Sequence, residues 1–317
     1  MAAKSSIYVV GDLHGSEVCW RKFLNAARFY GVDTIVVAGD VTGKALVPLV
    51  RRRDGRVEAR IGGRVQVGRT DEEIAALEDR ARFNGFYPYR CEEADYERLA
   101  ADDAHRDEVF TGIMADTLRS WLRLADERLA GTGITALVIP GNDDGWYVDD
   151  VLRESSTIVN PDGKVLDLGA YQVLGFGPSN RTPWNTHREL DEADIERCLR
   201  DLESSIDPGK PLVAVIHVPP YNSRLDVAPK LRPDLSVVVE GGETVMVPVG
   251  STAVRAFLER VQPLVSLHGH IHESRGFVKI GRTLAVNPGS AYSTGALNGA
   301  IVTLRDGKVQ SQQLVVG

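Results

Sequence analysis

The chain has 317 residues, of which 43% are hydrophobic and 26% charged, a composition that excludes a disordered or fibrous protein. This length suits one large α/β domain or two smaller ones. The net charge of −7 argues against broad electrostatic binding of nucleic acid, though not against a small nucleotide in a metal-lined cleft.

The three cysteines are isolated in the sequence and form no Cys-x-x-Cys pair. This spacing favours neither a disulfide framework nor a zinc ribbon. The N-terminus leads directly into an apolar strand, without a signal peptide, and the chain contains no apolar run of membrane-spanning length. We therefore expect a soluble cytoplasmic protein.

Acidic side chains follow the first two predicted strands of the chain. The apolar run 6–10 ends at Gly11-Asp12-Leu13-His14-Gly15, and the run 34–38 ends at Gly39-Asp40. Continuous apolar runs of this length are typical of strands buried on both faces. The Gly43-Lys44 pair that follows lacks the glycine spacing and the Ser/Thr of a Walker motif, so we do not interpret it as a phosphate loop.

The segment 44–110 interrupts the alternation of strands and helices. It contains a predicted hairpin around Gly62-Gly63, a capping box from Thr70 to Glu73, a turn with exposed aromatic residues at 84–89, and an acidic helix near 92–106. We interpret it as an insertion beside the main sheet that is either a cap over the site or a plain surface subdomain. A long helix is expected to follow at 111–129.

Three further strands carry metal-competent residues at their ends. The run 134–139 leads to Gly141-Asn142-Asp143, and the run 212–216 ends in His217. After a smaller excursion at about 221–250, the run 261–267 leads to the cluster His268-Gly269-His270-Ile271-His272. His187 has no ligand-type neighbours, so we place it on the surface.

Together, the residues at the strand ends form a ligand set too large for one ion. In open α/β sheets, ligands bind at the carboxyl ends of the strands. Two divalent ions about 3.5–4 Å apart that share one carboxylate would use such a set. Nitrogen and oxygen ligands without thiolate indicate Mn, Fe, Zn or Ni rather than Ca or Mg. The set consists of two carboxylates, one amide oxygen and four imidazoles: Asp12, His14, Asp40, Asn142, His217, His270 and His272.

The order of these motifs resembles that of the calcineurin-like metallophosphoesterases. The resemblance rests on GDLHG, GD, GND, the strand-terminal His217 and GHIH, which span Gly11 to His272 and cover nearly the whole chain. It implies one domain over 1–317 with a four-layer α/β/β/α sandwich of two mixed sheets and a dinuclear metal centre, with manganese favoured. It also implies a metal-dependent phosphoesterase in which a metal-bridging hydroxide attacks phosphorus in line.

The resemblance assigns a role to each matching residue. Asp40 would bridge the two ions, and His268, just outside the GHxH unit, would have a structural or supporting role. The first ion would be held by Asp12, His14 and His272, and the second by Asn142, His217 and His270.

One position departs from the family pattern. The third motif usually reads Gly-Asn-His, and its histidine contacts the substrate phosphate and helps to protonate the leaving group. Here Asp143 takes that place, on the substrate side of Asn142. An ionised carboxylate donates no proton and would repel a dianionic monoester more than a monoanionic diester, which favours a phosphodiesterase over a phosphomonoesterase. A raised pKa that kept Asp143 protonated would reverse this argument.

Two other functions are compatible with the family. A non-catalytic interaction module is one alternative, but a scaffold has no need of all seven ligands, which this chain retains. A DNA nuclease is the other, and the negative net charge argues against extended nucleic acid. We expect a small phosphorylated substrate, with a nucleotide as one candidate, and no membrane partner. The loops 44–110 and 221–250, which would contact the substrate, carry no recognisable motif.

Overall fold

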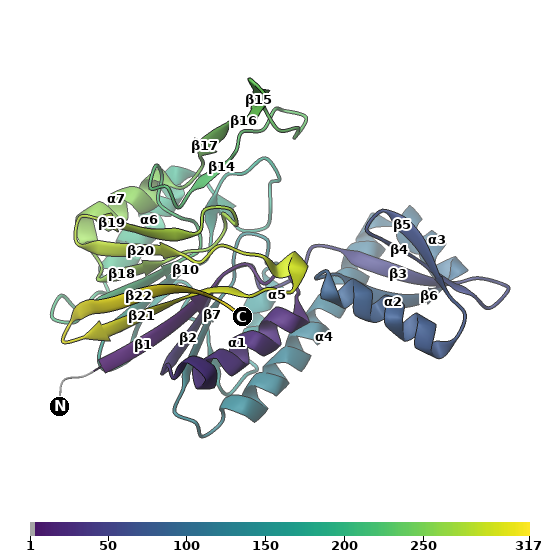
Figure 1. Cartoon of the computed structure of the whole chain (residues 1–317), viewed down its shortest axis with the longest axis horizontal. Coiled ribbons are helices and arrows are strands. Elements are labelled where there is room, and N and C mark those ends of the chain that lie inside the picture. The colour runs from purple at the N-terminus through teal and green to yellow at the C-terminus, as the bar shows by residue number, and fades with distance from the viewer. Residues whose placement is uncertain (1–3) are drawn as a thin grey trace.

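The computed structural model describes residues 4–317 and has the expected four layers, with two stacked sheets between helices (Figure 1). The first sheet has the order β22-β21-β1-β2-β7-β8, and the second β10-β13-β18-β20-β19. The strands of the first sheet are β1 (Lys4–Val10), β2 (Thr34–Ala38), β7 (Thr135–Ile139), β8 (Ile158–Val159), β21 (Asn298–Arg305) and β22 (Lys308–Val316). Those of the second are β10 (Gln172–Phe176), β13 (Leu212–Ile216), β18 (Val265–Leu267), β19 (Gly276–Ile280) and β20 (Thr283–Asn287).

Both sheets are mixed, which confirms the predicted fold class. Strands β1, β2, β7 and β8 are parallel, and β21 and β22 extend this sheet antiparallel. Strands β10, β13, β18 and β20 are parallel, and β19 is antiparallel. All the predicted ligands directly follow parallel strands, so they lie at the carboxyl edges of the two sheets.

Three apolar layers hold the sandwich together. Alternate residues of a strand face opposite sides of the sheet, so that Tyr8 of β1 packs towards the helices and Val9 towards the second sheet. On the helical side, the indoles of Trp20 and Trp121 stack with their ring centroids 5.4 Å apart. Helices α1 (Glu17–Tyr30), α4 (Asp103–Leu129) and α5 (Tyr147–Leu152) cover the first sheet, and α6 (Glu192–Glu203) and α7 (Thr252–Val261) cover the second.

The insertion forms a separate lobe that projects from the sandwich (Figure 1, right). Its sheet has the order β5-β4-β3-β6 and its own small core against α2. The predicted hairpin around Gly62 and the capping box of Thr70 with Glu73 are both present. The elements are β3 (Leu46–Arg51), β4 (Val57–Ile61), β5 (Arg64–Gly68), α2 (Asp71–Phe83), β6 (Tyr87–Glu92) and α3 (Glu93–Ala101).

Two predictions for this lobe were wrong. The expected turn with exposed aromatics at 84–89 continues into strand β6, which pairs parallel with β3 and buries Tyr87. Pro88 is tolerated because β6 is an edge strand. The expected helix near 92–106 is broken at Asp102, whose carboxylate accepts a hydrogen bond from His105 N (3.0 Å) and begins α4.

The excursion forms an arm, residues 227–248, that rises from the second sheet (Figure 1, top). It contains a small hairpin, in which Val239 pairs with Thr244. Among residues 4–317, no helix is long and apolar enough to cross a membrane. The arm consists of β14 (Val227–Pro229), β15 (Val239–Glu240), β16 (Glu243–Thr244) and β17 (Met246–Pro248); β9 (Lys164–Asp167), β11 (Ser179–Asn180), β12 (Glu189–Leu190) and the 3-10 turn η1 (Tyr292–Thr294) complete the described elements.

Candidate metal centre

The structure brings all seven predicted ligands together at the meeting edges of the two sheets. Within each of two groups of three, the ligand atoms lie within 4.8 Å of one another. Asn142 adjoins the second group, with its Oδ1 3.0 Å from His217 Nε2. The groups are Asp12 with His14 and His272, and Asp40 with His217 and His270.

Asp40 occupies the position between the two groups. Its Oδ2 lies 3.7 Å from His14 Nε2 in the first group and 3.5 Å from His217 Nε2 in the second. In the first group, His14 Nε2 and His272 Nε2 are 3.1 Å apart. A bridging carboxylate needs this central position.

The backbone is strained at four of these residues. The φ angles of Asp12, His14, Asp40 and His270 are 56°, 43°, 52° and 67°, in the left-handed region that residues other than glycine seldom adopt. Each such residue costs on the order of 1–3 kcal/mol and persists only where neighbours fix it. His270 N donates to Asp12 Oδ1 (2.9 Å), for example, so one strained loop supports the other. Clustered strain of this kind is typical of functional sites.

Glycines allow the ligand loops to approach one another. A Cβ atom on Gly39 would lie 2.1 Å from His217 Nδ1, and one on Gly141 would lie 2.2 Å from Asp40 Oδ1. On Gly269 it would lie 2.6 Å from an Asp12 carboxylate oxygen. The glycines that precede Asp40, Asn142 and His270 are therefore required by close packing.

The protonation states of the imidazoles suit metal ligands. Burial lowers the pKa of His14 to about 3 and that of His270 to about 4, so both rings are neutral at pH 7. His14 Nδ1 is buried and has no hydrogen-bond partner among the described residues. Burial also acts on His217, but the Asp40 carboxylate prevails and raises its pKa to about 10. Neutral, unpartnered imidazole nitrogens beside carboxylates fit a divalent cation, whose binding to His217 would displace a proton.

Asp143 is paired with a cation that sequence reasoning missed. The Lys44 ammonium forms a salt bridge with its carboxylate. Burial and the nearby Asp40 raise the pKa of Asp143 to about 6, while Lys44 opposes the increase. Asp143 also forms a third potential metal-binding group with His14 and Asp40. Lys44 drew attention in the sequence only as part of a rejected Walker motif.

Asp144 and Arg188 position the ligand loops and were also missed. The buried Asp144 carboxylate accepts hydrogen bonds from Val41 N (3.0 Å), Thr42 N (2.8 Å) and Gly141 N (2.8 Å), which joins the second and third motifs. The guanidinium of Arg188 donates to the carbonyl of Asp144 (2.8 Å). The acidic pair that follows Asn142 in the sequence could have indicated a role for Asp144 at the site. The sequence around Arg188 carries no such indication.

The two remaining histidines of interest lie outside the metal groups. His268 Nδ1 lies 2.8 Å from the carbonyl of Ile216, and its Nε2 lies 2.9 Å from Ser266 Oγ. His268 thus ties β18 to β13, a structural position, and burial lowers its pKa to about 4. His187 is exposed, but it borders the cavity over the centre.

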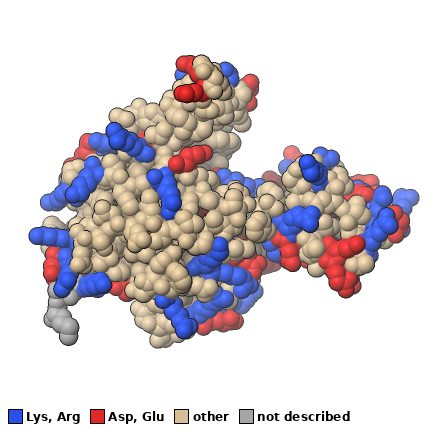
Figure 2. Space-filling model, in the orientation of Figure 1, with Lys and Arg blue, Asp and Glu red and all other residues tan. Residues whose placement is uncertain are grey.

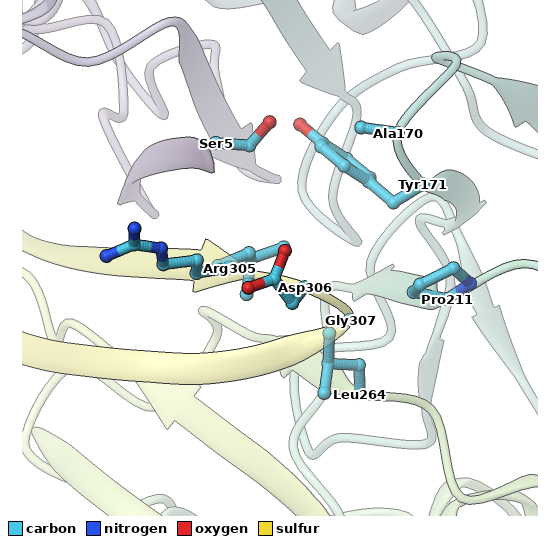
Figure 3. A pocket seen from close by; sticks show the side chains of 9 residues that line it. Ser5, Ala170, Tyr171, Pro211, Leu264, Arg305, Asp306 and Gly307 are labelled. Carbon is cyan, nitrogen blue, oxygen red and sulfur yellow. The ribbon is translucent and has the colours of Figure 1, made fainter. Parts of the chain in front are cut away.

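A cavity of about 1210 Å³ lies directly over the metal groups. Its walls come from the ligand loops, α4, the loop 181–187 and the arm. No strand of the insertion lines it within residues 4–317; Gly43, Lys44 and Phe110 border it from the two ends of the inserted segment. A second pocket, of about 50 Å³, lies at the opposite edge of the strands, where Ser5, Tyr171 and Leu264 meet (Figure 3).

Comparisons with known proteins show the fold. No protein-family model matches the chain. The uncharacterized protein MJ1162 of Methanocaldococcus jannaschii is 35% identical over 154 residues, which cover 48% of this chain and 62% of that relative, less than two thirds of its length. One solved crystal structure matches 99% of each chain with a TM-score of 0.58 and 16% identity. The crystal structure of TT1561 of Thermus thermophilus does so with a TM-score of 0.53 and 16% identity.

A structure of an archaeal phosphodiesterase is more distant. It covers 98% of this chain and 99% of its own, with a TM-score of 0.36 and 12% identity. Similarity at such low identity establishes architecture alone.

Proposed function

We propose that the protein is a metal-dependent phosphoesterase that hydrolyses a phosphodiester. One observation carries the proposal: seven metal-competent side chains converge in two adjoining groups around Asp40. The neutral imidazoles of His14 and His270, the central carboxylate and the glycine-dependent packing support a dinuclear centre. Two divalent ions held there would bind phosphoryl oxygens and supply an activated water as the nucleophile for in-line attack. The donors suit Mn, Fe, Zn or Ni, of which we favour manganese.

Lys44 and Asp143 set the charge on the substrate side. Their salt bridge lies at the cavity wall, beside Asp40. Lys44 offsets the carboxylate's repulsion of a phosphoryl group, and its half-exposed ammonium offers a hydrogen-bond donor to a substrate oxygen. Because the Lys44–Asp143 pair is neutral overall, it supplies no net positive charge to balance the second charge of a monoester, which supports the preference for a diester.

The distribution of charge on the surface favours a small substrate. On the face shown in Figure 2, Lys and Arg alternate with Asp and Glu over the insertion, and no single-sign stripe runs across it. Extended nucleic acid binds to basic stripes. The enclosed position of the metal groups favours a small phosphorylated molecule, with a nucleotide among the candidates.

Turnover of paired chromogenic substrates tests the proposal. Purified protein with added Mn²⁺ is assayed on bis(p-nitrophenyl) phosphate and p-nitrophenyl phosphate, alongside Asp40→Asn. We expect diester hydrolysis that exceeds monoester hydrolysis and falls by at least about 100-fold in Asp40→Asn, because the shared ligand is lost. The half-buried His105, which belongs to none of the metal groups, provides a control, His105→Ala, that should keep full activity. Inactivity on both esters with two metals bound would instead support the non-catalytic interaction module.

A further inference from the structure

The cavity over the metal groups is wider than a phosphate requires and is mainly apolar away from them. Its volume of about 1210 Å³ exceeds the roughly 300–1,000 Å³ of common ligand sites. Its ligand-loop end carries the charged and metal-competent groups. The remaining wall presents chiefly aliphatic and aromatic side chains: Phe110, Met114, Pro183, Trp184, Pro229, Leu231, Val237, Val247 and Val249.

The polar side chains of the loop 181–187 are largely used by the protein itself. Arg181 Nε donates to Asp191 Oδ1 (2.8 Å). The hydroxyls of Thr182 and Thr186 both donate to the buried Glu189 carboxylate. Asn185 and His187 keep exposed polar side chains at the cavity, beside the apolar surface of Pro183 and of the Trp184 indole, which is 62% exposed.

The arm forms the facing wall and is held in place at its base. The fully buried carboxylate of Asp226 accepts hydrogen bonds from Asn222 N (2.7 Å) and Gly250 N (3.1 Å). Asn180 Nδ2 donates to the carbonyl of Val249 (3.2 Å), which joins the arm to the strand before the loop 181–187. The apolar walls are thus preorganised around one space that is continuous with the metal groups.

We infer that the substrate is a phosphodiester with one extended aliphatic substituent, which lies between the arm and the loop 181–187. The inference rests on the proposed function of the same site. The arm side of the wall is aliphatic apart from Lys230, with Leu231, Val237 and Val247 among its side chains, and suits an alkyl chain. The polar groups that a nucleobase edge would need lie only on the opposite side of the space, at Asn185 and His187. In hydrolysis, the oxygen of water bonds to phosphorus and the bond from phosphorus to the second ester oxygen breaks. The second substituent leaves as an alcohol that carries one proton of the water, and the monoalkyl phosphate remains in the cavity.

A chain-length series tests the inference. The probes are p-nitrophenyl alkyl phosphates from methyl to hexyl, assayed with the Mn²⁺-loaded protein. Complete burial of a methylene strengthens binding by about fourfold. Partial burial therefore predicts a rise in kcat/KM of about two- to fourfold for each added carbon. Val237→Asp, at an exposed wall position, should flatten this rise because a carboxylate replaces an apolar wall side chain. Val239→Asp, exposed on the same arm but outside the wall, is the matched control and should keep the full rise.

Calorimetry adds a readout that is independent of turnover. Hexylphosphonate should bind more tightly than methylphosphonate and with a more negative heat-capacity change, the mark of apolar burial. Equal binding and a flat kcat/KM series would overturn the inference. A higher kcat/KM for p-nitrophenyl thymidine phosphate than for the hexyl ester would also overturn the inference. If Trp184→Ala then removed this preference, the result would indicate a substrate with an aromatic substituent instead. If the methyl diester itself is inert, the proposed function fails, and the phosphonate series still tests the apolar wall.

Discussion

Replacing Gly141 with alanine inserts one methyl group into the most crowded part of the metal centre. The added Cβ would lie 2.2 Å from Asp40 Oδ1, 2.4 Å from Asp40 N and 2.8 Å from His217 Cε1. Two of these atoms belong to predicted ligand side chains, and the third is backbone. The strain therefore cannot be relieved by rotating a flexible surface side chain.

The size of the expected effect follows from the overlap between the added Cβ atom and Asp40. Ordinary contacts of a Cβ begin near 3.4 Å, so the Asp40 loop must retreat by more than an ångström. Overpacking of this kind costs about 1–3 kcal/mol of folding free energy. A displacement of about 1 Å in a reacting group lowers activity by about 100-fold. We expect Gly141→Ala to fold with reduced stability and to lose most of its metal affinity.

Gly112→Ala provides the matched control. Gly112 lies on an exposed face of α4, and a Cβ there would contact nothing within 4 Å. The same chemical change should stabilise the protein by about 0.5–1 kcal/mol, because alanine favours a helix. The measurements are urea unfolding and calorimetric titration with Mn²⁺ on both variants. Wild-type Mn²⁺ affinity in Gly141→Ala would refute the close packing described for the ligand loops.

Three further predictions concern stability. Chelation should lower the unfolding free energy by about 2.7 kcal/mol for each of the two ions, relative to protein held at a metal concentration 100-fold above Kd, measured by urea unfolding; an unchanged value would contradict a metal centre. Arg188→Met should cost about 3–5 kcal/mol because it leaves buried acceptors unpaired, whereas the exposed Arg197→Met should change stability by less than about 0.5 kcal/mol. Although burial acts to raise the pKa of Asp126, hydrogen bonds from residues 155–157 keep it below its usual value. Asp126→Asn should therefore lose about 1–2 kcal/mol at pH 7. This difference should shrink as the pH falls below about 4, where the unfolded chain binds the Asp126 proton first, and down through the lower pKa of the folded protein; a constant difference from pH 7 to 3 would contradict this.

The sequence was most informative for the buried strands, because their position in the sheet produces a local pattern of apolar residues. Strands β1, β2, β7 and β13 are buried on both faces, so they are continuous apolar runs that periodicity alone identifies. Because parallel strands end at one edge, the motifs after them could be expected to meet, as the groups around Asp40 do. The glycines needed for close approach are visible in the same motifs.

The sequence was least informative where partners are distant along the chain. Arg188 is buried because Asp149 and the carbonyls of Asp144 and Gly145 surround its guanidinium, and no local pattern records these contacts. Lys44 acquires its role from Asp143 across the sheet edge. In the insertion, strand β6 was missed because its pairing with β3 outweighs the turn-like composition before it.

The most direct test of the account is the location of bound manganese in crystals of the protein soaked with Mn²⁺. Anomalous diffraction should show two peaks about 3.5–4 Å apart, with Asp40 between them. One should lie among Asp12, His14 and His272 and the other among Asn142, His217 and His270. A single peak, or peaks outside these groups, would contradict the dinuclear centre on which the proposed function rests.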